Sequence, residues 1–176
     1  MKKKITPLKL DHVAYRCNDA QETTNFYTQL LDMKLVAALT ADIVGSTKEF
    51  CPHIHIFFEM QDGSSVAFFE TPEEKPMLMD PNTPAWVQHL ALEVADRETQ
   101  LAIKDRLELA GVTVIGPKDG HLCVSIYFFD PSGHRLEIAY RKVTPNAATE
   151  RDAYRILKRW MQTKRPDKDL VLEQPI

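Results

Sequence analysis

An internal repeat constrains the fold more than any other feature of the sequence. Residues 10–14 (LDHVA) and residues 87–91 (VQHLA) have the same apolar pattern around one histidine. Each opens a predicted strand that leads to a helix with an aspartate at its start. Repetition within 176 residues indicates two copies of one small module that share a core. We therefore expect equivalent residues of the two modules to meet near a pseudo-two-fold axis.

Both halves of the sequence predict the same order of elements: a strand, a helix and three further strands. The first half has strands over residues 8–16, 34–44, 53–60 and 64–70 and a helix over residues 19–32; the second has strands over residues 87–94, 112–115, 122–129 and 134–140 and a helix over residues 96–110. We divide the chain into a first module (1–72), a linker rich in proline and acidic residues (73–85), a second module (86–142) and a C-terminal helix and tail (143–176). We expect the amphipathic C-terminal helix to pack on the domain, with a dimer contact as the alternative.

Composition narrows the class of partner. Hydrophobic residues make up 44% of the chain and charged residues 27%, as in folded soluble proteins. The net charge of -3 gives no basic field for nucleic acid, and no apolar run is long enough to span a membrane. The three cysteines have neither disulfide nor zinc-site spacing. We expect a cytoplasmic protein with a small-molecule substrate and no nucleic-acid or membrane partner.

Two histidines stand at equivalent positions of the repeat. Strand alternation puts His12 and Ala14 on one face of the first module, and His89 and Ala91 on the equivalent face of the second. The small alanines leave space beside each imidazole for a ligand. A single strand histidine is more often structural, but two at equivalent positions favour a binding site.

Each module also ends on a strand that carries a carboxylate among apolar residues. Glu70 follows residues 66–69 (VAFF), and Glu137 lies between two aliphatic residues. A buried carboxylate is costly unless it is paired or binds a cation. Imidazoles with carboxylates suit one divalent ion such as Fe, Mn, Ni, Co or Zn. The sequence thus predicts a metal site from His12, His89, Glu137 and Glu70.

Three motifs resemble the vicinal oxygen chelate superfamily, which includes glyoxalase I, extradiol dioxygenases, fosfomycin-resistance proteins and bleomycin-resistance proteins. They are residues 10–14 (LDHVA), residues 25–27 (NFY) ahead of 30–33 (LLDM), and residues 127–137 (YFFDPSGHRLE). The resemblance covers about residues 8–141. It implies an α+β fold in which two βαβββ modules form a mixed eight-stranded curved sheet around a metal cleft, with the C-terminal helix added. Module pairing across two chains is a familiar variation, so a homodimer is one expected form.

The resemblance implies that His12, His89 and Glu137 are metal ligands, and that Glu70 is where glyoxalase I has a fourth. In a glyoxalase I-like lyase or isomerase, our preferred interpretation, Glu70 would be catalytic because it shuttles a proton. Arg16 falls where glyoxalase I places a glutathione-contacting arginine. Acidic residues replace a glutathione-contacting asparagine, however, so glutathione is not favoured as the substrate.

The main alternative is an extradiol-type dioxygenase that uses Fe(II) or Mn(II). This chain resembles such enzymes at Tyr127, where they have a catalytic tyrosine, and at His121, where they have an upstream histidine. His121 is, however, closer to Tyr127 than their signature permits. His55 alternates toward one strand face and is a candidate substrate contact. A fosfomycin-type transferase matches less well because cationic residues are few. A metal-free binding or resistance module is the remaining alternative.

Overall fold

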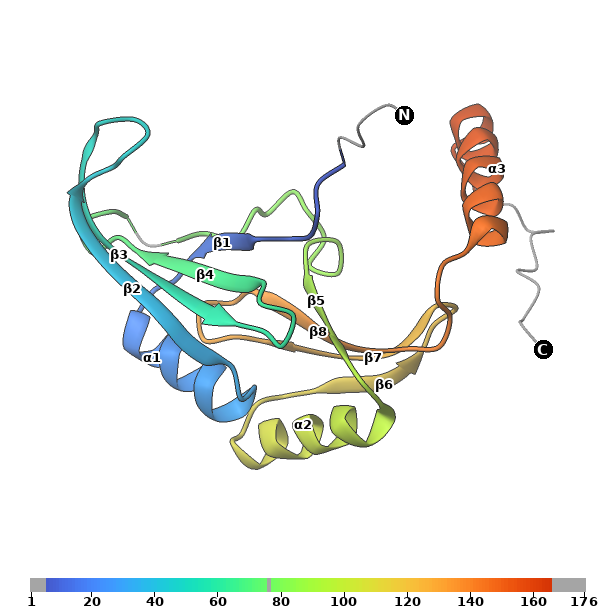
Figure 1. The fold of residues 1–176 in the computed structure, drawn as a ribbon, viewed down its shortest axis with the longest axis horizontal. Coiled ribbons are helices and arrows are strands. Elements are labelled where there is room, and N and C mark those ends of the chain that lie inside the picture. Colours follow the sequence, from blue (N-terminus) through green and yellow to red (C-terminus); the bar gives the residue numbers. More distant parts are fainter. Residues whose placement is uncertain (1–5, 76, 166–176) are drawn as a thin grey trace.

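The protein, described here by a computed structural model, consists of two βαβββ modules and a C-terminal helix (Figure 1). The structure describes residues 6–75 and 77–165, so the predictions for residues 1–5, residue 76 and the tail 166–176 lie outside the described residues. The first module contains β1 (His12–Arg16), α1 (Ala20–Asn25), the π-helical segment η1 (Phe26–Leu30), β2 (Lys34–Ile43), β3 (Phe50–Glu59) and β4 (Ser65–Glu70). The second contains β5 (Leu90–Val94), α2 (Arg97–Leu109), β6 (Ile115–Asp119), β7 (Cys123–Phe129) and β8 (Arg135–Arg141), and α3 (Ala147–Thr163) follows. The predicted α+β class with two βαβββ modules is confirmed, and the eight strands form two four-stranded sheets where one eight-stranded sheet was expected.

The eight strands form two four-stranded sheets of identical topology. The strand orders are β1-β4-β3-β2 and β5-β8-β7-β6, with the first and last strands of each module parallel and the other neighbours antiparallel. Ala14 pairs with Ala67 in the first sheet, and Ala91 pairs with Glu137 in the second. Because Ala14 and Ala91 each lie two residues after a repeat histidine, these two pairs occupy equivalent positions.

Each sheet turns one face toward a common core and leaves the other face open. Val13 and Tyr15 of β1 pack against this core, as do Leu90 and Leu92 of β5. The buried apolar residues of both modules form one cluster: Cys17, Phe26, Tyr27, Met33, Ile56, Phe58, Val66, Phe68, Leu92, Leu107, Ile126, Phe128, Leu136 and Ile138. Side chains alternate along a strand, so the open faces carry the residues between the buried ones. We call them the first and second open faces; both point away from the shared core.

The two modules are joined through α1, η1 and the turn between β7 and β8. The hydroxyl of Tyr27 donates a hydrogen bond to Asp130 Oδ2 at 3.1 Å, and both side chains are buried. Burial raises the pKa of Tyr27 and that of Asp130. His134 lies in the same turn, where its ring Nε2 is 2.7 Å from the carbonyl oxygen of Arg16. These contacts fix the orientation of the two sheets within one chain.

Four strands begin three or more residues away from their predicted starts, and one of them, β3, begins earlier than predicted, at Phe50. Both β1 and β5 begin later than predicted, because their partner strands begin only at Ser65 and Arg135. The strand predicted over residues 112–115 lies instead at Ile115–Asp119. Val112 and Val114 pack against the core, but the backbone pairs with β7 only from Ile115 onward. Side-chain burial and strand pairing therefore begin at different residues here.

The C-terminal helix does not pack on the domain as expected. α3 begins with a capping box, in which the Asn146 side chain accepts hydrogen bonds from the backbone of Ala148 and Thr149. It stands apart from both sheets and buries none of its residues (Figure 1). Of the helices in the described part of the chain, none has the length and apolar character needed to cross a bilayer.

Candidate metal centre

The structure brings two of the predicted ligands together on the second open face. His89 Nε2 lies 3.0 Å from Glu137 Oε2, and the side chain of Glu137 is only 8% exposed. The small Ala91 pairs with Glu137 in the β5–β8 register, which leaves room beside the carboxylate. The other oxygen of Glu137 accepts a hydrogen bond from the buried Ser125 hydroxyl. One imidazole and one oriented carboxylate are thus available for a shared cation.

Tyr127 and Arg135 flank this pair. Tyr127 lies opposite Glu137 in the β7–β8 register, and its ring is 6.2 Å from the His89 ring. The guanidinium carbon of Arg135 lies 4.7 Å from the centre of the Tyr127 ring, and its Nε is buried without a hydrogen-bond partner among the described residues. His89 and Arg135 also line part of a hollow of about 460 Å³, whose lining includes Asp80 but neither Glu137 nor Tyr127. The Arg135 guanidinium beside the Tyr127 ring is suited to bind a negatively charged oxygen of a small substrate.

His12 lies on the first open face, at the start of β1. Its Nδ1 is 2.7 Å from Asp11 Oδ2, and its side chain is 40% exposed. A carboxylate that accepts a hydrogen bond from Nδ1 leaves the Nε2 lone pair free for a metal, a pairing common among metal-binding histidines. Ala14 and Ala67 lie beside one another further along the same face. His12 is therefore presented as a ligand, with space next to it.

His55 lies near His12, with the ring centres 6.3 Å apart. Its ring stacks on Phe69 at 3.6 Å and contacts Phe57 at 4.1 Å. Burial lowers the pKa of His55, and the neighbouring His12 and His53 lower it further. Its Nε2 is buried and has no partner among the described residues. The result is an aromatic wall of His55, Phe57 and Phe69 with one unsatisfied polar atom.

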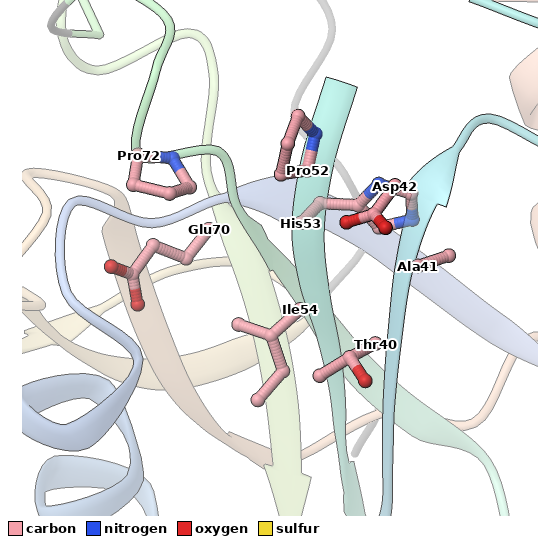
Figure 2. A pocket seen from close by; sticks show the side chains of 8 residues that line it. All are labelled: Thr40, Ala41, Asp42, Pro52, His53, Ile54, Glu70 and Pro72. Carbon is pink, nitrogen blue, oxygen red and sulfur yellow. The ribbon is translucent and has the colours of Figure 1, made fainter. Parts of the chain in front are cut away.

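Glu70, the predicted fourth ligand, lies on the opposite face of the sheet from His12. Its carboxylate accepts a 2.7 Å hydrogen bond from the backbone nitrogen of Ala20, in the first turn of α1. Figure 2 shows the carboxylate pointing away from His53 and Asp42. In the repeat, the first-module residue equivalent to Glu137 is Ala67, as the Ala14–Ala67 and Ala91–Glu137 pairs show. Glu70 thus binds the backbone at the start of α1, and the first-module position equivalent to Glu137 has no carboxylate.

The other two predicted site residues have different surroundings. Arg16 donates hydrogen bonds to the carbonyl oxygens of Thr71 and Glu74 at 3.3 and 3.4 Å, so it holds the start of the linker. His121 is exposed in the connection between β6 and β7. It makes no hydrogen bond or ion pair within the part of the chain that the structure describes.

One chain therefore presents two incomplete sites. Among residues 6–75 and 77–165, no group of three or more histidine, cysteine, aspartate or glutamate side chains is arranged to hold a metal ion. We name the His89–Glu137 pair the carboxylate half-site and His12 with Asp11 the histidine half-site. The donor types fit a divalent transition metal, and each half-site alone has fewer than the three ligands that the sequence predicts. The half-sites lie on open faces that both point outward.

Sequence reasoning missed Ser125 and Asp11, the two residues that orient predicted ligands. A signal for Ser125 was present in the tight turn at residues 130–133. This turn sets the β7–β8 register, in which Ser125 lies on the same face as Tyr127 and next to Glu137. Asp11 precedes His12 directly, but adjacent residues of an extended segment usually point to opposite sides, so its contact was not expected.

Comparisons with known proteins agree with this architecture. A family model described as the Glyoxalase/Bleomycin resistance protein/Dioxygenase superfamily matches residues 9–138. No curated protein matches the sequence significantly.

Several solved structures share the fold. A glyoxylase/bleomycin resistance protein/dioxygenase domain from Frankia sp. EAN1pec has a TM-score of 0.62 and 18% identity, over 79% of this chain and 100% of that one. The fosfomycin resistance protein FosX from Listeria monocytogenes has a TM-score of 0.57 and 17% identity, over 78% and 97%. Lactoylglutathione lyase from Agrobacterium tumefaciens has a TM-score of 0.53 and 17% identity, over 76% and 94%.

Proposed function

Because the chain belongs to the Glyoxalase/Bleomycin resistance protein/Dioxygenase superfamily, we propose that it is a divalent-metal-dependent enzyme acting on a small substrate with two adjacent oxygens. We further propose that it works as a homodimer, in which His12 of one copy joins His89 and Glu137 of the other. The observation that carries this proposal is the 3.0 Å contact between His89 and Glu137 on an outward-facing surface. A symmetric dimer brings the two half-sites together twice.

The ligand set defines what the site would hold. Two neutral imidazoles and one carboxylate suit iron, manganese, nickel, cobalt or zinc better than calcium or magnesium. A bound ion of this kind supplies the Lewis acidity that polarises substrate oxygens. Ser125 and Asp11 hold Glu137 and His12 in position through their hydrogen bonds.

The residues around the carboxylate half-site have separate roles toward the substrate. The Arg135 guanidinium attracts a negatively charged oxygen and fixes its orientation, since no acidic side chain in the described residues neutralises it. The Tyr127 hydroxyl is a candidate proton donor beside Glu137. Across the dimer, the aromatic wall of His55, Phe57 and Phe69 would exclude water from one side of the substrate.

The position of Glu70 supports one of the narrower reactions over the other. In the glyoxalase I-like reaction a second metal-bound carboxylate besides Glu137 would move the proton, but Glu70 faces α1 and the position equivalent to Glu137 holds Ala67. A three-ligand site with Tyr127 next to Glu137 and an aromatic wall near His12 favours the extradiol-type reaction on an aromatic diol. We therefore propose ring-cleaving dioxygenase chemistry ahead of lyase or isomerase chemistry.

Metal analysis of protein purified without chelators, combined with oxygen uptake on a panel of catechols, tests the proposal. We expect bound iron or manganese and oxygen consumption. Glu137→Gln should lose the metal, whereas the control Glu93→Gln, on the same face and paired with Arg141 at 3.1 Å, should retain it. Protein without any bound metal would refute the enzyme proposal and favour a metal-free binding module. Bound metal without oxygen uptake would refute the dioxygenase reaction alone.

A further inference from the structure

The exposed face of α3 has no part in the proposed site. Large apolar side chains follow one side of this helix: Tyr154, Leu157, Trp160 and Met161 are 68%, 54%, 45% and 62% exposed. Four basic residues, Arg151, Arg155, Lys158 and Arg159, lie on its remaining surface. The helix lies beyond residue 138, where the match to the superfamily ends. An apolar face of this size on a folded chain marks an interaction surface.

The hairpin of β2 and β3 has complementary properties. Ile43 and Phe50 pair across the two strands at the end nearest the turn and are 48% and 68% exposed. Asp42 precedes Ile43 and Glu49 precedes Phe50, so each member of this apolar pair has an acidic neighbour along the chain. We call these four residues the hairpin tip. An apolar pair with an acidic border matches an apolar helix face with a basic border.

We propose that the apolar face of α3 docks on the hairpin tip of a second copy of this chain, and that the pairing occurs twice around a two-fold axis. α3 and the hairpin project at opposite ends of the molecule, above the level of the sheets in Figure 1, so neither reaches the other within one chain. α3 follows β8, the strand that carries Glu137, after a short connection. The same second copy would supply His12 to the carboxylate half-site, and in this respect the inference rests on the proposed function.

The charge distribution of the chain favours a second copy over a lipid surface as the partner of α3. α3 has four basic and two acidic side chains, whereas the whole chain has a net charge of -3, so the remainder of the molecule is acidic. Anionic lipid would attract the basic face of α3 but would repel the acidic body attached to it. A second copy offers α3 an acidic, apolar target and buries both exposed surfaces.

Sedimentation of the full chain over a range of concentrations tests this docking. We expect a wild-type dimer, and a dissociation constant at least about tenfold larger for Leu157→Asp or Phe50→Asp, as for central interface residues. Leu109→Asp makes the same chemical change at an exposed residue at the end of α2, and should leave the dimer unchanged. Circular dichroism of each variant confirms folding.

A charge exchange tests the pairing itself. Reversal of the two basic residues beside the apolar face (Arg151→Glu with Lys158→Glu) should weaken the dimer, and so should reversal of the two acidic residues of the tip (Asp42→Lys with Glu49→Lys). The four changes together should restore much of the lost affinity, because each new charge meets its opposite. A monomeric wild type, an unweakened Leu157→Asp dimer, or absence of this rescue would overturn the docking.

Two further measurements separate the outcomes. If Leu157→Asp abolishes binding to phosphatidylcholine–phosphatidylglycerol vesicles while the dimer is unchanged, α3 binds membranes and the docking is wrong. Metal content is measured in the same samples at a concentration where all variants are dimeric. A weakened dimer in which no variant binds metal would refute the proposed function alone, whereas full metal content with an unweakened dimer would refute the docking alone.

Discussion

Glu70→Gln should destabilise the protein without loss of metal, although Glu70 was predicted from the sequence to be a ligand. In the structure, its carboxylate accepts a 2.7 Å hydrogen bond from the nitrogen of Ala20, in the first turn of α1. The first helical N–H groups have no partner within the helix, and the helix N-terminus attracts negative charge. The amide keeps an oxygen that can accept the bond but removes the charge.

The expected cost follows from these two interactions. Loss of a negative charge at a helix N-terminus costs about 0.3–1 kcal/mol. Exchange of a charge-assisted hydrogen bond for a neutral one costs about a further 1 kcal/mol. A total of about 1–2 kcal/mol corresponds to a decrease in Tm of roughly 2–8 °C for a chain of this length.

Thermal unfolding at fixed protein concentration and elemental analysis of the same preparation measure the two effects together. Glu70→Gln should unfold at lower temperature and contain as much metal as the wild type. Glu137→Gln, the matched change at the carboxylate half-site, should lose the metal. If Glu70→Gln lost the metal and kept the wild-type Tm, Glu70 would be a ligand, and our assignment of it to the helix start would be wrong.

Two further predictions concern buried hydroxyl groups. Ser125→Ala should lower metal affinity by about 10–100-fold, because the Ser125 hydroxyl orients Glu137, and competition with a chelator measures the change. Unchanged affinity would remove Ser125 from the site. Tyr27→Phe should lower the free energy of unfolding by about 1.5–3 kcal/mol, because it removes a hydrogen bond to the buried Asp130. In urea unfolding, the exposed control Tyr154→Phe should stay within about 0.5 kcal/mol of the wild type.

The repeat and its period-two alternation were sufficient to predict the fold. They identified eight strands and the helices, because apolar alternation directly records which face of each strand is buried. The family resemblance implied one eight-stranded sheet, whereas the chain has two four-stranded sheets, because the joining of the sheets depends on how the modules pack. Val112 and Val114 show where the alternation misleads: both are partly buried against the core, as strand residues would be, but neither pairs with a neighbouring strand.

The structure brings two predicted ligands together in the second module, whereas Glu70 in the first module lies on the opposite face of the sheet from His12. His89 and Glu137 were predicted as neighbours and lie 3.0 Å apart. Glu70 was assigned because it ends the equivalent strand, but it lies three residues beyond Ala67, the position equivalent to Glu137. An odd offset along a strand reverses the face of the sheet. Only the pairing register, which connects β1 to β4 across fifty residues of sequence, reveals this.

The sharing of one metal site between two copies is tested most directly by mixing two inactive variants. His12→Ala and His89→Ala should each bind almost no metal alone. When equal amounts are unfolded and refolded together, half of the dimers are hybrids, and each hybrid has one intact site made from His12 of one copy and His89 of the other. We predict recovery of about one quarter of the wild-type metal content in a symmetric dimer. If the mixture bound no more metal than the separate variants, the shared site would be contradicted.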